Sequence, residues 1–129
     1  VRKPEDGYWS NVWLVDPWVA SYWGGRPTED WMFSQVYSKN AIDTGWSETF
    51  FNNPRFEELL PQARAELDDA KRREMYVEMQ RVVHDNCSVI IPIFSAYGHA
   101  SSDKVKRPEN IASNWEFDGN KNAERWWFG

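Results

Sequence analysis

Residues 46–94 read WSETFFNNPRFEELLPQARAELDDAKRREMYVEMQRVVHDNCSVIIPIF, and this stretch decides which fold the chain can adopt. Asn53 followed by Pro54 is typical of a helix start, because Asn caps free amides and proline suits the first helical position. We predict an amphipathic helix from there, with its apolar stripe at Phe56, Leu59, Leu60, Ala63 and Leu67. Pro61 lacks an N–H and crowds the carbonyl of Glu57, so we expect a kink or a broken turn there.

A second helix follows almost at once. Asp68 or Asp69 caps it, and we predict that it covers about residues 70–85, with an apolar side of Met75, Tyr76, Met79, Val82 and Val83. Because the connection is so short, the two helices are expected to form an antiparallel hairpin. The apolar run Ser88–Phe94 (SVIIPIF) is then predicted to be a buried strand, despite its Pro92.

The sequence upstream contains further elements. Residues 8–23 are rich in aromatic and β-branched residues, which favours two short strands, or a strand and a turn, interrupted at Pro17. Residues 24–27 (GGRP) have the composition of a loop. Thr28 is a predicted N-cap for a short helix over about residues 29–38, and the polar residues 38–52 are expected to be turns.

Strands on both sides of a helix pair predict an α/β fold: a mixed sheet with flanking helices, including the antiparallel pair. Residues 96–111 are polar. The tail after them is expected to be irregular, with aromatic anchors at Trp115, Phe117, Trp126, Trp127 and Phe128.

Composition excludes several classes of protein. The chain has 129 residues, 41% hydrophobic residues and nine tryptophans, enough for one domain or a piece of a larger one. Its net charge is −5 and its basic runs are short, so we expect no nucleic-acid partner. No apolar run is long enough to span a bilayer, and residues 1–9 do not resemble a signal peptide. The single cysteine, Cys87, forbids an internal disulfide and is expected to be a buried thiol.

Candidate chemistry is sparse. His84 and Cys87 have a spacing that metal ligands use, but zinc sites need about four ligands, and a capping or core histidine is the alternative. Glu29 and Asp30 are adjacent acids, which point in different directions on a helix and suit its first turn better than a catalytic pair. We therefore predict no enzyme activity, no catalytic residue, no metal and no cofactor.

The best binding candidate is the segment Ser21–Phe33. A tryptophan before a Gly-Gly turn offers a flat apolar face beside exposed amides, and Arg26 adds a planar fork suited to carboxylates. The predicted ligand-binding residues are Tyr22, Trp23, Gly24, Gly25, Arg26 and Asp30. The alternative is a packed tryptophan, a plain turn and a solvated arginine.

Several motifs of this chain occur in one order. They are Tyr22-Trp23-Gly24-Gly25, the aromatic stretch Trp46–Phe51, the helix start Asn53–Leu60, the segment Asp68–Tyr76 and Ile91-Pro92-Ile93. Over roughly residues 9–111 this series resembles the C-terminal end of family 5 extracellular solute-binding proteins, the peptide- and nickel-type receptors of ABC importers.

The resemblance implies a periplasmic protein with a type II periplasmic-binding-protein fold, of which this chain is a C-terminal fragment. Residues 1–87 would end the second lobe, and residues 88–129 would supply a strand and tail that return toward the first lobe. The implied partners are a peptide-like, opine-like or other small solute, and the ABC permease subunits of the full-length system. The start at Val1 without a signal peptide fits a fragment.

Arg26 departs from the family pattern. Peptide receptors commonly carry an acidic residue there to pair with an α-ammonium group, so an Arg26 that faces the ligand predicts preference for an anionic group. Two other functions stay open: a protein–protein interaction module that forms a homodimer of the isolated fragment, and a small hydrolase that uses Glu29 and Asp30.

Overall fold

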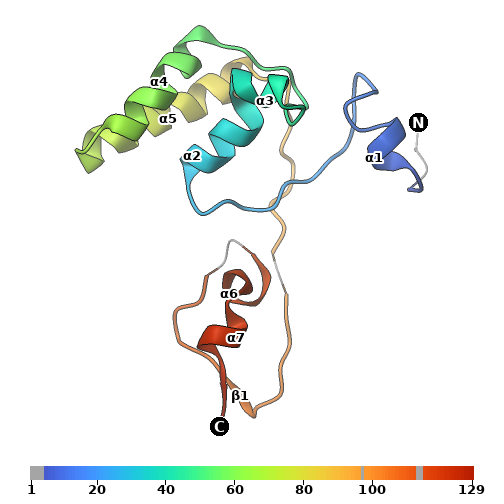
Figure 1. Ribbon diagram of the computed structural model, residues 1–129, viewed down its shortest axis with the longest axis vertical. Helices are drawn as coiled ribbons and strands as arrows, with labels where there is room; N and C mark the ends of the chain where they lie inside the picture. The colour runs from blue at the N-terminus through green and yellow to red at the C-terminus, as the bar shows by residue number, and fades with distance from the viewer. Residues whose placement is uncertain (1–4, 97, 113–114) are drawn as a thin grey trace. The chain divides into compact units, whose positions relative to one another are not determined.

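A computed structural model describes residues 5–96, 98–112 and 115–129. The chain divides into two compact units: unit 1 comprises residues up to Trp23 together with Thr28–Ile90, and unit 2 comprises Gly24–Pro27 together with Ile91–Gly129. Unit 1 contains helices and turns: α1 (Tyr8–Asn11), α2 (Glu29–Met32), the π-helical η1 (Phe33–Tyr37), α3 (Lys39–Asp43), α4 (Pro54–Ala65) and α5 (Asp69–Asn86) (Figure 1).

The two long helices begin where the sequence predicts. The Asn53 side chain accepts hydrogen bonds from the amides of Arg55 (3.0 Å) and Phe56 (3.2 Å), which caps α4. Asp68 accepts from the amides of Ala70 and Lys71 in the same way and caps α5. The predicted helix pair is confirmed, since α4 and α5 lie side by side and run antiparallel (Figure 1).

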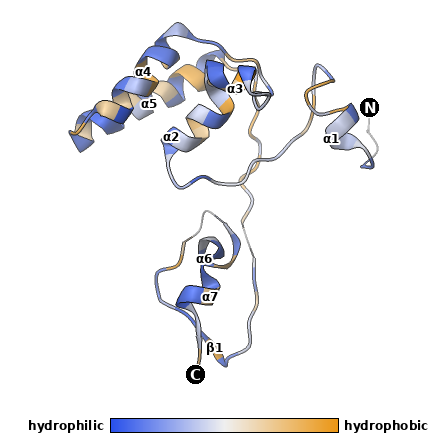
Figure 2. Ribbon diagram, viewed as in Figure 1, coloured by the Kyte–Doolittle hydropathy of each residue, from blue (hydrophilic) through white to orange (hydrophobic). Residues whose placement is uncertain are grey.

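The core of unit 1 lies between these helices, both of which have hydrophobic and hydrophilic residues (Figure 2). One cluster joins their facing sides to two phenylalanines from upstream, and its buried members are Phe33, Phe51, Phe56, Leu59, Leu60, Ala63, Met79 and Val83. The predicted apolar faces are therefore correct, with one exception. Leu67 is 91% exposed, because α4 ends at Ala65 and Leu67 lies in the connection.

Helix α4 continues through Pro61, so the predicted broken turn does not occur. Pro61 is exposed, while its neighbours Leu60 and Ala63 are buried in the core. Packing of the opposite face holds the helix together across the hydrogen bond that proline cannot make.

The short helix near residue 29 is also confirmed, with a change of geometry. The Thr28 hydroxyl accepts from the amide of Trp31 (3.2 Å), and α2 runs on into η1, where i→i+5 hydrogen bonding replaces the α pattern. Ser38 ends η1 and caps α3 through its hydroxyl. Helix α3 lies in the stretch that the sequence assigned to turns, and Ser38 was the cap signal that could have revealed it.

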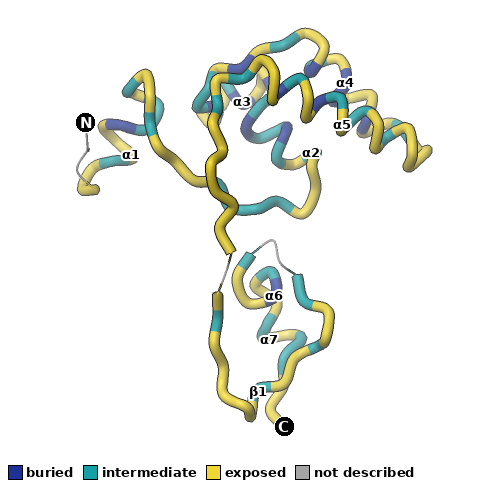
Figure 3. Tube along the Cα trace, turned by 180° about the vertical axis from the view of Figure 1, so that it is seen from behind, coloured by how far each residue is buried: buried dark blue, intermediate teal, exposed yellow. Residues whose placement is uncertain are grey.

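Two predicted strand regions are wrong. Residues 8–18 form α1, turns and bends, and residues 19–23 have no regular structure, because their aromatic rings pack against one another and against Trp46. Ser88–Phe94 is extended but not buried: Ile90, Ile93 and Phe94 are 71%, 75% and 89% exposed (Figure 3). No strand in the described residues pairs with this segment, so no sheet of these residues covers its side chains.

Unit 2 has the only sheet of the described residues. Strands β1 (Val105–Lys106) and β2 (Trp127–Phe128) pair antiparallel, with Val105 opposite Phe128. Between them lie α6 (Glu116–Asn120) and α7 (Asn122–Arg125).

Helix α6 contains a left-handed turn. Phe117, Asp118 and Gly119 have φ of 49°, 64° and 65°, a conformation that costs energy for residues with a Cβ. The buried Asp118 carboxylate offsets this cost by accepting from the Ala112 amide (2.6 Å) and the Arg125 guanidinium (2.7 Å).

The α/β prediction therefore holds only in its general form, of helices combined with a small sheet. The described sheet has two antiparallel strands, so the predicted mixed sheet is absent from these residues. None of the described helices is long and apolar enough to cross a membrane.

We predict that Met79→Ala lowers the free energy of unfolding by about 2–5 kcal/mol, because Met79 is fully buried between α4 and α5 and its truncation leaves a cavity. Leu67→Ala is the control, with an expected change within about 0.5 kcal/mol for an exposed side chain. Urea unfolding followed by far-ultraviolet circular dichroism measures both. Equal losses for the two variants would contradict this assignment of the core.

A second prediction concerns Glu78, whose pKa is lowered by its hydrogen bond to Arg55 across the two helices. A carboxyl with a folded pKa below its unfolded value stabilises the fold above the unfolded pKa and loses that effect as the pH falls. Glu78→Gln should therefore lower Tm at pH 7 and leave it nearly unchanged at pH 3. Glu74→Gln on the same helix is the control; a Glu78→Gln effect that is equal at both pH values would refute the prediction.

Candidate functional site

Glu48 is the common acceptor of three side-chain hydrogen bonds in unit 1. Its Oε1 accepts from Trp13 Nε1 (2.5 Å) and from the Ser21 hydroxyl (2.5 Å), and its Oε2 accepts from Trp23 Nε1 (3.0 Å). All three donors are electrically neutral. Among the residues that the structure describes, Glu48 forms no ion pair.

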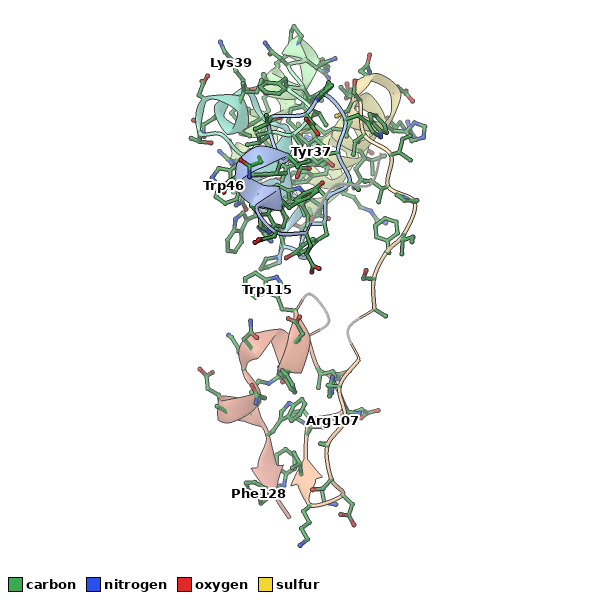
Figure 4. The ribbon with its side chains drawn as sticks, turned by 90° about the vertical axis from the view of Figure 1, so that its right-hand side faces the viewer. Tyr37, Lys39, Trp46, Arg107, Trp115 and Phe128 are labelled. Carbon is green, nitrogen blue, oxygen red and sulfur yellow. The ribbon has the colours of Figure 1, made fainter. Side chains whose placement is uncertain are left out.

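Indole rings surround this carboxylate. Trp46, which is labelled in Figure 4, is 46% exposed. Its ring meets the rings of Trp13 and Trp23 at angles of 62°, with centroid separations of 6.1 and 6.0 Å. We call Trp13, Ser21, Trp23, Trp46 and Glu48 the Glu48 site.

Two further rings extend the surface of this site. Trp9 contacts both Trp13 and Tyr22 edge to face, and Tyr22 is 78% exposed. The Glu48 site therefore continues into an aromatic surface that solvent can reach.

Contacts of the residues before and after Glu48 fix its position. Immediately before it, the amides of Trp46 and Ser47 both donate to the Ala41 carbonyl of α3, at 2.8 and 3.0 Å. Immediately after it, the Thr49 hydroxyl accepts from the Cys87 thiol at 3.3 Å, and Phe51 enters the core. The helical core thus fixes the position of Glu48, and the segment with Trp13 and Trp23 is hydrogen-bonded to the Glu48 carboxylate.

The predicted ligand-binding residues have different surroundings. Tyr22 and Trp23 belong to the aromatic surface just described. Arg26 Nη1 donates to the carbonyls of Gly24 (2.9 Å) and Gly25 (3.4 Å), which lie in its own loop. Asp30 pairs with Arg64 of α4 through Nε (2.6 Å), so α4 holds it at the start of α2.

Sequence reasoning missed Glu48, Trp13 and Trp46 as site residues. Glu48 is 25 residues from Trp23 and 35 from Trp13, and no local pattern predicts hydrogen bonds over such separations. The available signal was an acidic residue inside the aromatic stretch Trp46–Phe51, with no basic residue beside it.

The other candidates for chemistry have ordinary structural surroundings. His84 Nδ1 lies 2.7 Å from its neighbour Asp85, and Cys87 contacts Thr49. Within the described ranges, no group of three or more His, Cys, Asp or Glu side chains is placed to hold a metal ion.

A groove lies along α5. Its lining is Glu29, Asp69, Arg72, Arg73, Tyr76, Val77 and Gln80. Arg72 in this groove is already hydrogen-bonded to Asp69 and to the Glu66 carbonyl. The remaining charged residues, Glu29 and Arg73, have opposite signs, so the charge of the groove favours no class of ligand.

Comparison with known proteins found no matching family model, no similar curated protein and no similar solved structure.

Burial raises the pKa of the Cys87 thiol, partly offset by its hydrogen bond to Thr49. A raised pKa leaves less of the reactive thiolate near pH 8, so Cys87 should react with a thiol reagent such as DTNB more slowly in the folded chain than in guanidinium. Thr49→Val removes the hydrogen-bonding hydroxyl at similar size and should slow the reaction further. Equal rates in folded and unfolded chain would contradict the described burial.

Proposed function

We propose that this chain is the C-terminal portion of the substrate-binding component of an ABC importer, a non-enzymatic periplasmic protein. It captures a peptide-like, opine-like or other small solute, which the full receptor delivers to its permease subunits. The ordered series of motifs from Tyr22 to Ile93, which resembles family 5 solute-binding proteins, is the basis of this proposal.

One observation supports it most. Trp23 and the stretch Trp46–Phe51 belong to separate pieces of the motif series, and they meet at the Glu48 site. Ligand sites of proteins combine flat apolar faces with a few fixed polar groups. Trp46 and Tyr22 supply such faces, and Glu48 supplies a fixed polar group on the same surface.

The finer fold belongs to the same proposal. In a type II periplasmic-binding-protein lobe, α4 and α5 would form a helical layer. The apolar segment Ile90–Phe94 would then be a strand whose sheet neighbours belong to the rest of the receptor.

A ligand screen tests the proposal. The chain is titrated with small peptides, opines and other solutes, and Tm is followed; a bound solute stabilises by about 2.7 kcal/mol at a hundred times its Kd. Tyr22→Ala should weaken binding of the solute found at least about tenfold, because Tyr22 is exposed on the aromatic surface.

Trp18→Ala is the matched control, because Trp18 is another strongly exposed aromatic residue of the same segment (68%). It should leave the affinity unchanged. A screen in which no solute raises Tm, or equal effects of the two variants, would refute solute capture at this surface.

A second candidate is a protein–protein interaction module, which the exposure of Ile90, Ile93 and Phe94 favours. Exposed apolar stretches of this kind often mark contact surfaces. Light scattering after size exclusion decides the question: a dimer that Ile93→Asp converts to a monomer supports this candidate, and a wild-type monomer opposes it.

A further inference from the structure

We propose that the Glu48 site binds the ammonium group of an organic cation. This inference rests on the proposed function, because it names the class of solute that the aromatic surface would take. The sequence, in contrast, predicts a preference for anions on the basis of Arg26.

Uncompensated charge is the first reason. The Glu48 carboxylate is partly buried and accepts from two indole N–H groups and one hydroxyl, with no ion-pair partner among the described residues. Neutral donors can hydrogen-bond to a carboxylate without cancelling its charge. A cation brought to this carboxylate gains more than a neutral or an anionic group does.

Geometry is the second reason. Oε1 already accepts two hydrogen bonds, whereas Oε2 accepts one, from Trp23, and an ionised carboxylate oxygen has room for another. An ammonium group has three donors and fits that position. The Ser21 bond to Oε1 is exposed and the Trp23 bond to Oε2 is part-buried, so solvent reaches one oxygen of the carboxylate and the open position lies on the more enclosed oxygen.

The aromatic surroundings are the third reason. A cation is attracted to the face of an indole ring within about 6 Å of its centroid. Trp46 and Trp23 contact each other beside Glu48, and the half-exposed Trp46 is open to solvent. A cation bound at Glu48 would therefore have indole rings of the same site beside it, whereas an anion there would meet no opposite charge.

One nitrogen of the Arg26 guanidinium is already occupied within its own loop. Its Nη1 is engaged by the carbonyls of Gly24 and Gly25. An anion at that nitrogen would displace these hydrogen bonds, so binding there starts from a cost that binding at Glu48 does not have.

The test compares three probes of the same length on the full chain: n-butylammonium, n-butanol and butyrate. Binding is followed by the indole N–H resonances of Trp13 and Trp23 in ¹⁵N NMR. We expect saturable shifts with n-butylammonium, at least about tenfold weaker response to n-butanol, and none with butyrate. Equal responses to the cation and the alcohol, or a stronger response to butyrate, would overturn the proposal.

Glu48→Gln should reduce the affinity for n-butylammonium at least about tenfold while the chain keeps its near-ultraviolet circular dichroism. Glu74→Gln removes the same charge from an exposed site on α5 and should change nothing. If Glu48→Gln disturbs the fold, the three-probe comparison on the wild-type chain decides alone.

The outcomes separate this inference from the proposed function. A screen that finds solutes of any charge bound at Tyr22, with no preference for the cation, overturns only the inference. A chain that binds no solute overturns both.

Discussion

The packing of α4 against α5 is the constraint on which the rest of unit 1 depends. Phe56 and Met79 are fully buried where the helices meet, and Phe33 and Phe51 pack into the same cluster from upstream. Burial of a large apolar side chain contributes roughly 1.5–3 kcal/mol, more than any single surface contact of this chain. Since Phe51 lies three residues after Glu48, the position of the carboxylate follows from the position of this core.

The N-terminal segment depends on a different kind of contact. It joins the helical core through hydrogen bonds to Glu48 and through indole edges, with Val12 its only buried hydrophobic residue among those described. Three donors share one acceptor, so loss of that acceptor leaves all three without their partner. Such polar attachments have strict geometry and modest net stability, which suits a surface that responds to a ligand.

Sequence patterns predicted the elements whose causes are local. The caps Thr28, Asn53 and Asp68 act over two or three residues, and the stripe containing Phe56 and Met79 follows the helical period, so all could be read from the chain. The role of Glu48 could not be predicted, because its hydrogen-bond partners are 25 to 35 residues away in the sequence. The failure at Ser88–Phe94 has another cause: apolar composition predicts burial, but burial also needs a neighbouring strand. Of the predicted binding residues, Tyr22 and Trp23 lie on the surface of the Glu48 site.

Pro92 gives the exposed segment Ile90–Phe94 a property of its own. The segment is extended, apolar on both sides and, together with Ser88, Val89, Ser95 and Ala96, contains no charged residue, which is the composition of chains that stack into cross-β fibrils. Proline cannot donate a backbone hydrogen bond, so every ladder formed along this stretch is interrupted at its centre. Pro92 therefore opposes the stacking of this segment, and its replacement by valine would leave the seven residues from Ser88 to Phe94 with a complete row of backbone donors.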